Sequence, residues 1–170
     1  MVSISSQELL SALTVSGVNE LIESNDRLNA TLATFVQPLI SRSVIESDGY
    51  KLNMLEILPP NMDTSGRKRY PVLIRVYGGP GSQMVSNVFT RDWHSYLACD
   101  RKYIVVMVDG RGTGFKGRAL RNPVMDDLGH YEVVDQIKAA AEISKRNYVD
   151  SSRIGIWGWV CGSVDGMEHR

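Results

Sequence analysis

The chain has 170 residues with 19 basic and 19 acidic side chains, so its formal net charge is zero, and 43% of its residues are hydrophobic. Zero net charge argues against binding to nucleic acid or to an anionic membrane surface, because both require a basic excess. The longest aliphatic run, residues 104–108, is far shorter than the roughly 20 residues that cross a bilayer. Two cysteines, Cys99 and Cys161, exclude a disulfide-rich scaffold and a cysteine-based structural zinc site. What remains is an ordinary globular composition.

The first 60 residues contain one predicted helix and one predicted hairpin. Apolar residues at helical spacing predict a helix over residues 19–35. Two short apolar runs within residues 43–58 flank Asp48-Gly49, a dipeptide typical of tight hairpin turns. Pro59-Pro60 ends the second strand.

From residue 71 onward, predicted strands and helices alternate. The strands cover residues 71–77, 103–108 and 153–157, and the helices cover residues 89–98 and 131–146. The last helix carries one predicted apolar stripe, formed by Val133, Val134, Ile137, Ala140, Ala141 and Ile143. This alternation predicts an α/β fold with a parallel sheet and right-handed crossovers.

A glycine-rich loop, Gly112-Thr113-Gly114-Phe115-Lys116-Gly117, matches the G-x-G-x-x-G pattern of dinucleotide-binding loops and follows a predicted strand. Such a loop must open directly into a helix whose N–H groups hold the pyrophosphate. Pro123 follows shortly, and the next strong helical pattern begins near residue 131, so we expect no helix to open at Gly117. A structural loop with several positive φ angles is favoured, and a nucleotide-binding domain is kept as an alternative.

A second glycine-rich segment, Tyr77-Gly78-Gly79-Pro80-Gly81, follows the strand predicted at residues 71–77. Ligands of open α/β sheets bind at the carboxyl ends of the strands. An α/β-hydrolase builds part of its oxyanion hole from the equivalent loop. The alternative is a tight turn with a stacking tyrosine.

The third segment, Gly158-Trp159-Val160-Cys161-Gly162, follows the strand predicted at residues 153–157. With serine at its middle position it would be the G-x-S-x-G nucleophile elbow of an α/β-hydrolase. The middle residue is Val160, which has no nucleophilic atom. A thiol at Cys161 is one position off, and a sharp turn aims it away from the site.

These segments closely resemble the dipeptidyl peptidase IV branch of the prolyl oligopeptidase family of serine peptidases, especially its fungal members. The resemblance covers residues 21–159 and rests on three motifs. They are Tyr70-Pro71-Val72-Leu73-Ile74-x-Val76-Tyr77-Gly78-Gly79-Pro80-Gly81-Ser82-Gln83, Val108-Asp109-Gly110-Arg111-Gly112-Thr113-Gly114 and Asp150-x-x-Arg153-Ile154-x-Ile156-Trp157-Gly158-Trp159. It implies that residues 41–159 form the first half of an α/β-hydrolase domain, a mostly parallel sheet with flanking helices. Residues 1–40 would be the end of a β-propeller and a connector, and residues 160–170 a tail outside the family pattern, expected to be disordered.

The resemblance also implies a function, the release of N-terminal X-Pro or X-Ala dipeptides from peptide substrates without a cofactor or metal. Tyr77 matches the family tyrosine that donates a hydrogen bond to the oxyanion of the tetrahedral intermediate. The backbone N–H of Cys161 would be the second donor, and Val160 occupies the nucleophile position. Family members are often homodimeric, and fungal ones are anchored in the vacuolar membrane or secreted.

The chain departs from the family at the elbow, where the family has Gly-Trp-Ser-Tyr/Phe-Gly-Gly and this chain has Gly158-Trp159-Val160-Cys161-Gly162-Ser163. The acid and histidine of an α/β-hydrolase triad follow the serine along the chain. Since only 11 residues follow Trp159, we expect these 170 residues to be inactive on their own. A non-catalytic, hydrolase-like interaction module is the alternative function.

Overall fold

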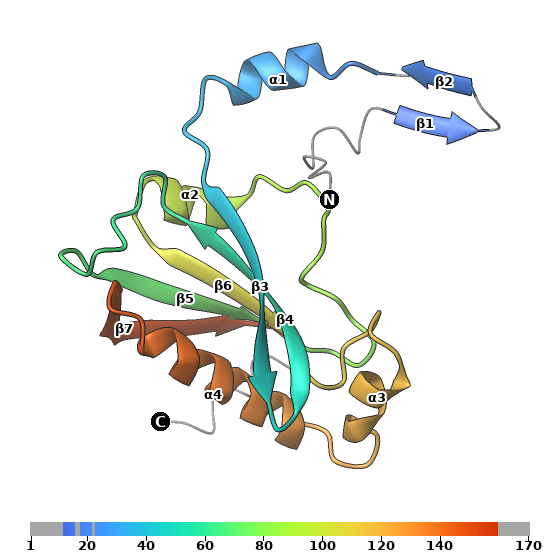
Figure 1. Cartoon of the computed structure of the whole chain (residues 1–170), viewed down its shortest axis with the longest axis vertical. Helices are drawn as coiled ribbons and strands as arrows, with labels where there is room; N and C mark the ends of the chain where they lie inside the picture. The colour runs from blue at the N-terminus through green and yellow to red at the C-terminus, as the bar shows by residue number, and fades with distance from the viewer. Residues whose placement is uncertain (1–11, 16–17, 22, 160–170) are drawn as a thin grey trace.

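The computed structural model describes residues 12–15, 18–21 and 23–159, and Figure 1 shows their arrangement. Most of the described chain packs around a five-stranded sheet with the strand order β3-β4-β6-β5-β7. The strands are β3 (Leu39–Ser47), β4 (Tyr50–Leu58), β5 (Tyr70–Val76), β6 (Ile104–Asp109) and β7 (Val149–Gly158). β5, β6 and β7 are parallel, as the pattern from residue 71 predicts, whereas β3 and β4 are antiparallel additions at one edge.

The predicted hairpin is confirmed, and it is longer than the apolar runs indicated. β3 and β4 pair in register from Leu39 opposite Leu58 to Ser47 opposite Tyr50. Asp48 and Gly49 between them have φ angles of 49° and 82°. Positive φ at both central residues is what a two-residue hairpin turn requires, and Asp-Gly adopts it at little cost.

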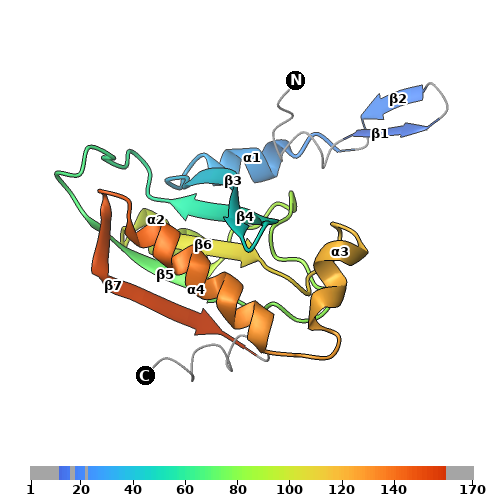
Figure 2. The same ribbon diagram turned by 60° about the horizontal axis from the view of Figure 1, so that its bottom comes forward.

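Helices cover both faces of the sheet. α4 (His130–Ser144) lies along one face, as Figure 2 shows, and α2 (Trp93–Cys99) contacts the other through Ala98. β6 is buried on both faces, as its apolar sequence predicts. Its residues alternate between the two cores, with Ile104, Val106 and Val108 in the cluster that contains Ala139 and Ile143 of α4, and Val105 and Met107 in the cluster that contains Ala98.

The helix predicted over residues 19–35 is wrong in its first part. Val18–Leu21 is strand β2, paired with β1 (Ala12–Val15), and helix α1 covers only Asp26–Leu32. Asn25 has a φ of 56°, and its N–H is bonded to the Glu23 carboxylate 2.9 Å away. This local turn separates the strand from the helix, because a left-handed residue cannot continue a right-handed helix. α1 buries no residue.

Helix α4 has the predicted position but turns a different face to the sheet. Its buried residues are Glu132, Val133, Asp135, Gln136, Ala139 and Ile143, whereas Ile137 of the predicted stripe is 43% exposed. The apolar pattern therefore misplaced the helix face, because polar side chains occupy half of the buried positions. One of them, Asp135, is completely buried.

Candidate active site

Tyr77 begins a tight turn, residues 77–82, at the carboxyl end of β5. Gly78 and Gly81 have φ angles of 67° and 75°, which favour glycine. A Cβ added at Gly79 would lie 2.9 Å from Cζ and 3.0 Å from the hydroxyl oxygen of Tyr77. The phenol therefore rests directly on the Gly79 backbone, and a side chain at position 79 would displace it.

The Tyr77 ring also stacks on Trp159. β5 and β7 pair in parallel up to Val76 opposite Gly158, which brings the next residues of both strands together. The rings of Tyr77 and Trp159 are stacked, with centroids 5.3 Å apart and planes 13° apart. The guanidinium of Arg75 lies 5.2 Å from the Trp159 ring centroid. The predicted oxyanion tyrosine thus contacts both a glycine backbone and the residue that precedes the elbow position.

The two remaining predicted site residues, Val160 and Cys161, lie outside the described residues. Their position in the chain directly after Trp159 is all that connects them with Tyr77. The assignment of Val160 to the nucleophile position and of the Cys161 N–H to the oxyanion hole stays a prediction.

The glycine-rich loop, residues 110–117, packs against the turn that carries Tyr77. The Gly81 N–H donates to the Gly112 carbonyl and the Gly114 N–H donates to the Ser82 carbonyl, each over 2.8 Å. A Cβ on Gly114 would lie 2.6 Å from the Gly81 carbonyl oxygen, so only glycine permits this approach. The two glycine-rich segments, far apart in sequence, are therefore joined by backbone hydrogen bonds.

The expectation that no helix opens at Gly117 is wrong. The four-residue helix α3 (Arg118–Arg121) begins there, followed by the 3-10 turn η2 (Asn122–Val124), which accommodates Pro123. The loop N–H groups are nevertheless used internally, since those of Gly112, Thr113 and Gly114 donate to carbonyls of Leu120, Gly110 and Ser82. A phosphate held by this loop would have to displace these bonds, which disfavours the nucleotide-binding alternative.

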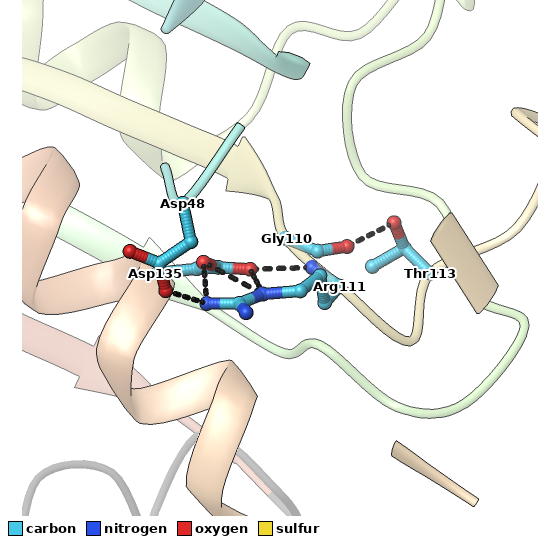
Figure 3. Close-up of polar contacts among 5 residues, drawn as sticks. All are labelled: Asp48, Gly110, Arg111, Thr113 and Asp135. Atoms are coloured by element: carbon cyan, nitrogen blue, oxygen red, sulfur yellow. Dashed lines mark hydrogen bonds and ion pairs between the residues drawn. The ribbon is translucent and has the colours of Figure 1, made fainter. Parts of the chain in front are cut away.

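Arg111 anchors the loop through a buried ion pair (Figure 3). Its Nη2 lies 2.7 Å from Oδ1 of Asp135 and 2.9 Å from Oδ2 of Asp48, and its backbone N–H donates to Oδ2 of Asp135 over 2.7 Å. Arg111 is 3% exposed and Asp135 is fully buried. Hydrogen bonding to Asp135 raises the pKa of Arg111, so the guanidinium stays charged.

Sequence reasoning included Arg111 in a family motif but missed Asp135 altogether. An available signal was an acid among the apolar residues of the α4 pattern. A buried carboxylate such as Asp135 needs a charged partner, and Arg111 of the glycine-rich loop is that partner.

A second carboxylate, Asp109 at the end of β6, fixes the segment beyond the Tyr77 turn. It accepts the N–H groups of Met84 and Val85 over 2.8 and 3.0 Å. Burial raises the pKa of Asp109. These two bonds hold the chain at residues 84 and 85 against the end of β6.

A sequence model described as the Prolyl oligopeptidase family matches residues 89–164. The probable dipeptidyl-aminopeptidase B of Uncinocarpus reesii is 50% identical over 143 residues, and that of Arthroderma gypseum is 48% identical over 143 residues. These matches cover 84% of this chain but only 15% of each relative. The chain therefore spans less than a fifth of the length of the curated relatives it matches.

Solved structures agree with the sequence matches. Porphyromonas gingivalis dipeptidyl peptidase 4 superposes with a TM-score of 0.80 at 36% identity, over 88% of this chain and 21% of that one. The acylaminoacyl peptidase of Pyrococcus horikoshii superposes with a TM-score of 0.72 at 19% identity, over 89% of this chain and 24% of that one, a likeness of fold alone.

The mixed sheet, its flanking helices and these superpositions define part of an α/β-hydrolase peptidase domain. Within that class, the sequence matches confirm the resemblance given by the motifs. Over most of its length the chain is similar to the dipeptidyl peptidase IV branch of the prolyl oligopeptidase family. No helix in the described part of the chain is long and apolar enough to cross a membrane.

Proposed function

We propose that residues 41–159 supply part of the peptidase domain of a serine-type dipeptidyl peptidase that releases N-terminal X-Pro or X-Ala dipeptides from peptides. The observation that carries the proposal is the place of Tyr77, held at the carboxyl end of β5 beside Trp159. The names of the fungal relatives and of the Porphyromonas gingivalis structure support the dipeptidyl specificity.

In this proposal Tyr77 is the side-chain donor of the oxyanion hole. Its phenol contacts Gly79 and stacks on Trp159, so the position of the hydroxyl oxygen is constrained before substrate binds. Preorganised donors stabilise a developing oxyanion because they need no reorganisation during the reaction. The Cys161 N–H is proposed as the second donor, one residue after the nucleophile position.

Val160 at that position has no atom that can attack a carbonyl. We therefore propose that the 170 residues as they stand do not hydrolyse peptides. Replacing Val160 with serine alone is not expected to create activity, since a serine needs an adjacent base to take its proton. A non-catalytic, hydrolase-like interaction module remains the alternative function. Val160 favours it, because valine cannot act as the nucleophile.

We further propose that residues 1–40 are the end of a propeller and a connector. β1, β2 and α1 lie outside the five-stranded sheet. The first strand of the five-stranded sheet, β3, begins at Leu39, close to this proposed boundary.

The proposed role of Tyr77 can be tested by grafting residues 41–159 into the dipeptidyl-aminopeptidase B of Uncinocarpus reesii in place of the matching segment. We expect the graft to hydrolyse a Gly-Pro-anilide substrate. Tyr77→Phe in the graft removes one donor and should lower kcat by about 100- to 1,000-fold, with little change in KM. Steady-state kinetics measure both constants.

Tyr103→Phe is the matched control, because it removes a phenol hydroxyl from a residue that packs against the core on α2's side of the sheet. We expect that variant to keep the kcat of the graft. Equal kcat for the Tyr77→Phe variant and the unmodified graft would contradict the oxyanion role of Tyr77.

A further inference from the structure

We propose that Arg111 is a positioning residue for the Tyr77 ring. It acts through the 110–117 loop and the 77–82 turn, although none of its hydrogen bonds goes to Tyr77. The inference rests on the proposed oxyanion role of Tyr77 for its functional meaning. The experiment below measures the position of the Tyr77 ring and not peptide hydrolysis. The positioning role of Arg111 and the oxyanion role of Tyr77 can therefore fail independently.

The first step is the anchoring of Arg111 itself. Its guanidinium contacts two aromatic rings, with Cζ 5.2 Å from the Tyr50 centroid and 4.6 Å from the Tyr131 centroid. Asp135 accepts from Nε, Nη2 and the backbone N–H of the same residue. Both the side chain and the main chain of Arg111 are therefore fixed to helix α4, as the dashed lines in Figure 3 show.

The second step is the stiffening of the loop around Arg111. A Cβ on Gly110 would lie 3.1 Å from Oδ2 of Asp135, so the loop backbone lies directly on the carboxylate. Thr113 is 1% exposed, and its hydroxyl donates to the Gly110 carbonyl over 2.6 Å. The residues before and after Arg111 are thus held to each other and to α4.

The third step is the link between the 110–117 loop and the turn that bears Tyr77. The loop and the turn share two backbone hydrogen bonds, from Gly81 to Gly112 and from Gly114 to Ser82. Within the turn, the Ser82 N–H donates to the Gly79 carbonyl over 2.9 Å. Gly79 is the residue on which the phenol rests. We therefore expect a displacement of the loop to move Gly79, and with it the Tyr77 ring.

The experiment is fluorine NMR on the 170-residue chain labelled with fluorotyrosine. All seven tyrosines lie among the described residues, and Tyr77→Phe assigns the resonance of interest by its loss. The stacked Trp159 ring shifts this resonance away from that of free fluorotyrosine, since the two planes are nearly parallel. Arg111→Met should shift the Tyr50 and Tyr131 resonances, which contact the guanidinium, and should also move Tyr77 toward the free position.

The matched control is Arg146→Met, which breaks a second arginine–carboxylate pair, between Arg146 just after α4 and Glu56 on β4. Arg146 contacts Tyr148, so the Tyr148 resonance should shift and Tyr77 should stay. Gly114→Ala separates the loop from the turn and should move Tyr77 while leaving Tyr50 and Tyr131 in place. Arg111→Lys keeps the charge but not the planar fork, and it should not restore the Tyr77 resonance.

A folded Arg111→Met chain with shifted Tyr50 and Tyr131 resonances and an unmoved Tyr77 resonance would overturn the proposal. Restoration by Arg111→Lys would also count against it, because charge balance would then suffice. Should Arg111→Met fail to fold, Arg111→Lys serves in its place, because it keeps the charge beside Asp135 and loses the planar fork. That variant must then move both Tyr50 and Tyr77, and a shift of Tyr50 alone refutes the proposal.

Discussion

Two arginine–carboxylate pairs fasten helix α4 to the rest of the domain. Arg111 of the glycine loop binds Asp135 on the helix, where the two side chains are 4% and 0% exposed. Arg146, just after the helix, binds Glu56 on β4, and these side chains are 25% and 6% exposed. The charges are the same in both pairs. The Arg111 pair is buried beside the proposed site, whereas the Arg146 side chain is partly exposed to water.

Because the two pairs differ in burial, we expect the loss of each arginine to have a different effect. A buried ion pair adds little net stability, because desolvation offsets the attraction, yet removal of one partner leaves a charge without water or counter-ion. Arg146 also lies at the carboxyl end of α4, where the helix dipole favours a cation. The Arg146 pair is therefore a fastening between helix and sheet, whereas the Arg111 pair determines the path of a loop.

The largest expected effect is the loss of stability when each arginine is removed. Arg111→Met should lower the free energy of unfolding by about 3–5 kcal/mol, because Asp135 is left charged and fully buried. Arg146→Met should lower it by about 1–3 kcal/mol, because water can replace part of the contact with Glu56. Urea unfolding of the two variants at neutral pH measures both changes.

The double variant Arg111→Met with Asp135→Leu provides the control for this explanation. Removing the carboxylate as well should recover a large part of the lost stability. If the double variant is as unstable as Arg111→Met, the buried charge is not the cause. If both single variants lose the same free energy, burial does not distinguish the pairs.

A smaller loss of stability is expected when the contact between the 110–117 loop and the 77–82 turn is disturbed. Gly114→Ala places a Cβ 2.6 Å from the Gly81 carbonyl oxygen and should cost about 1–3 kcal/mol as the loop moves away. Gly155→Ala in β7 is the matched control, since its Cβ would meet only Leu73 Cδ1 at 3.9 Å. That variant should be neutral or stabilising by about 0.4–1 kcal/mol. Thermal unfolding of both proteins decides whether the close approach at Gly114 matters.

The smallest effect is expected from surface charges near the Arg146 end. Hydrogen bonds from Ser152 and Arg153 lower the pKa of Asp150 from its ordinary 3.8 to about 2. A depressed folded pKa means stabilisation that is present above pH 3.8 and is lost as the pH falls to about 2. Asp150→Asn should therefore be slightly less stable than the original chain at pH 7. The two proteins should become equal near pH 2 in urea unfolding curves, and a constant gap would contradict this.

Several features of the fold could be predicted because their causes are local. Asp48-Gly49 specifies a hairpin turn through its positive φ angles, and the apolar run of β6 specifies a strand buried on both faces. The glycines around Tyr77 and the segment before Trp159 gave the α/β-hydrolase resemblance. The place of Tyr77 at the carboxyl end of a strand was therefore predicted from the sequence.

Other features depend on residues that meet only in the folded chain. The pairing of β5 with β7 puts Trp159 on the Tyr77 ring, and no local pattern contains that register. The inward face of α4 was mispredicted because its apolar residues alone do not determine the rotation of the helix. Asp135 turns inward to meet Arg111, 24 residues earlier in the chain. Turn angles and strand periods follow from neighbouring residues, whereas the partner of a buried charge is decided by packing, since only packing removes the water that would otherwise solvate it.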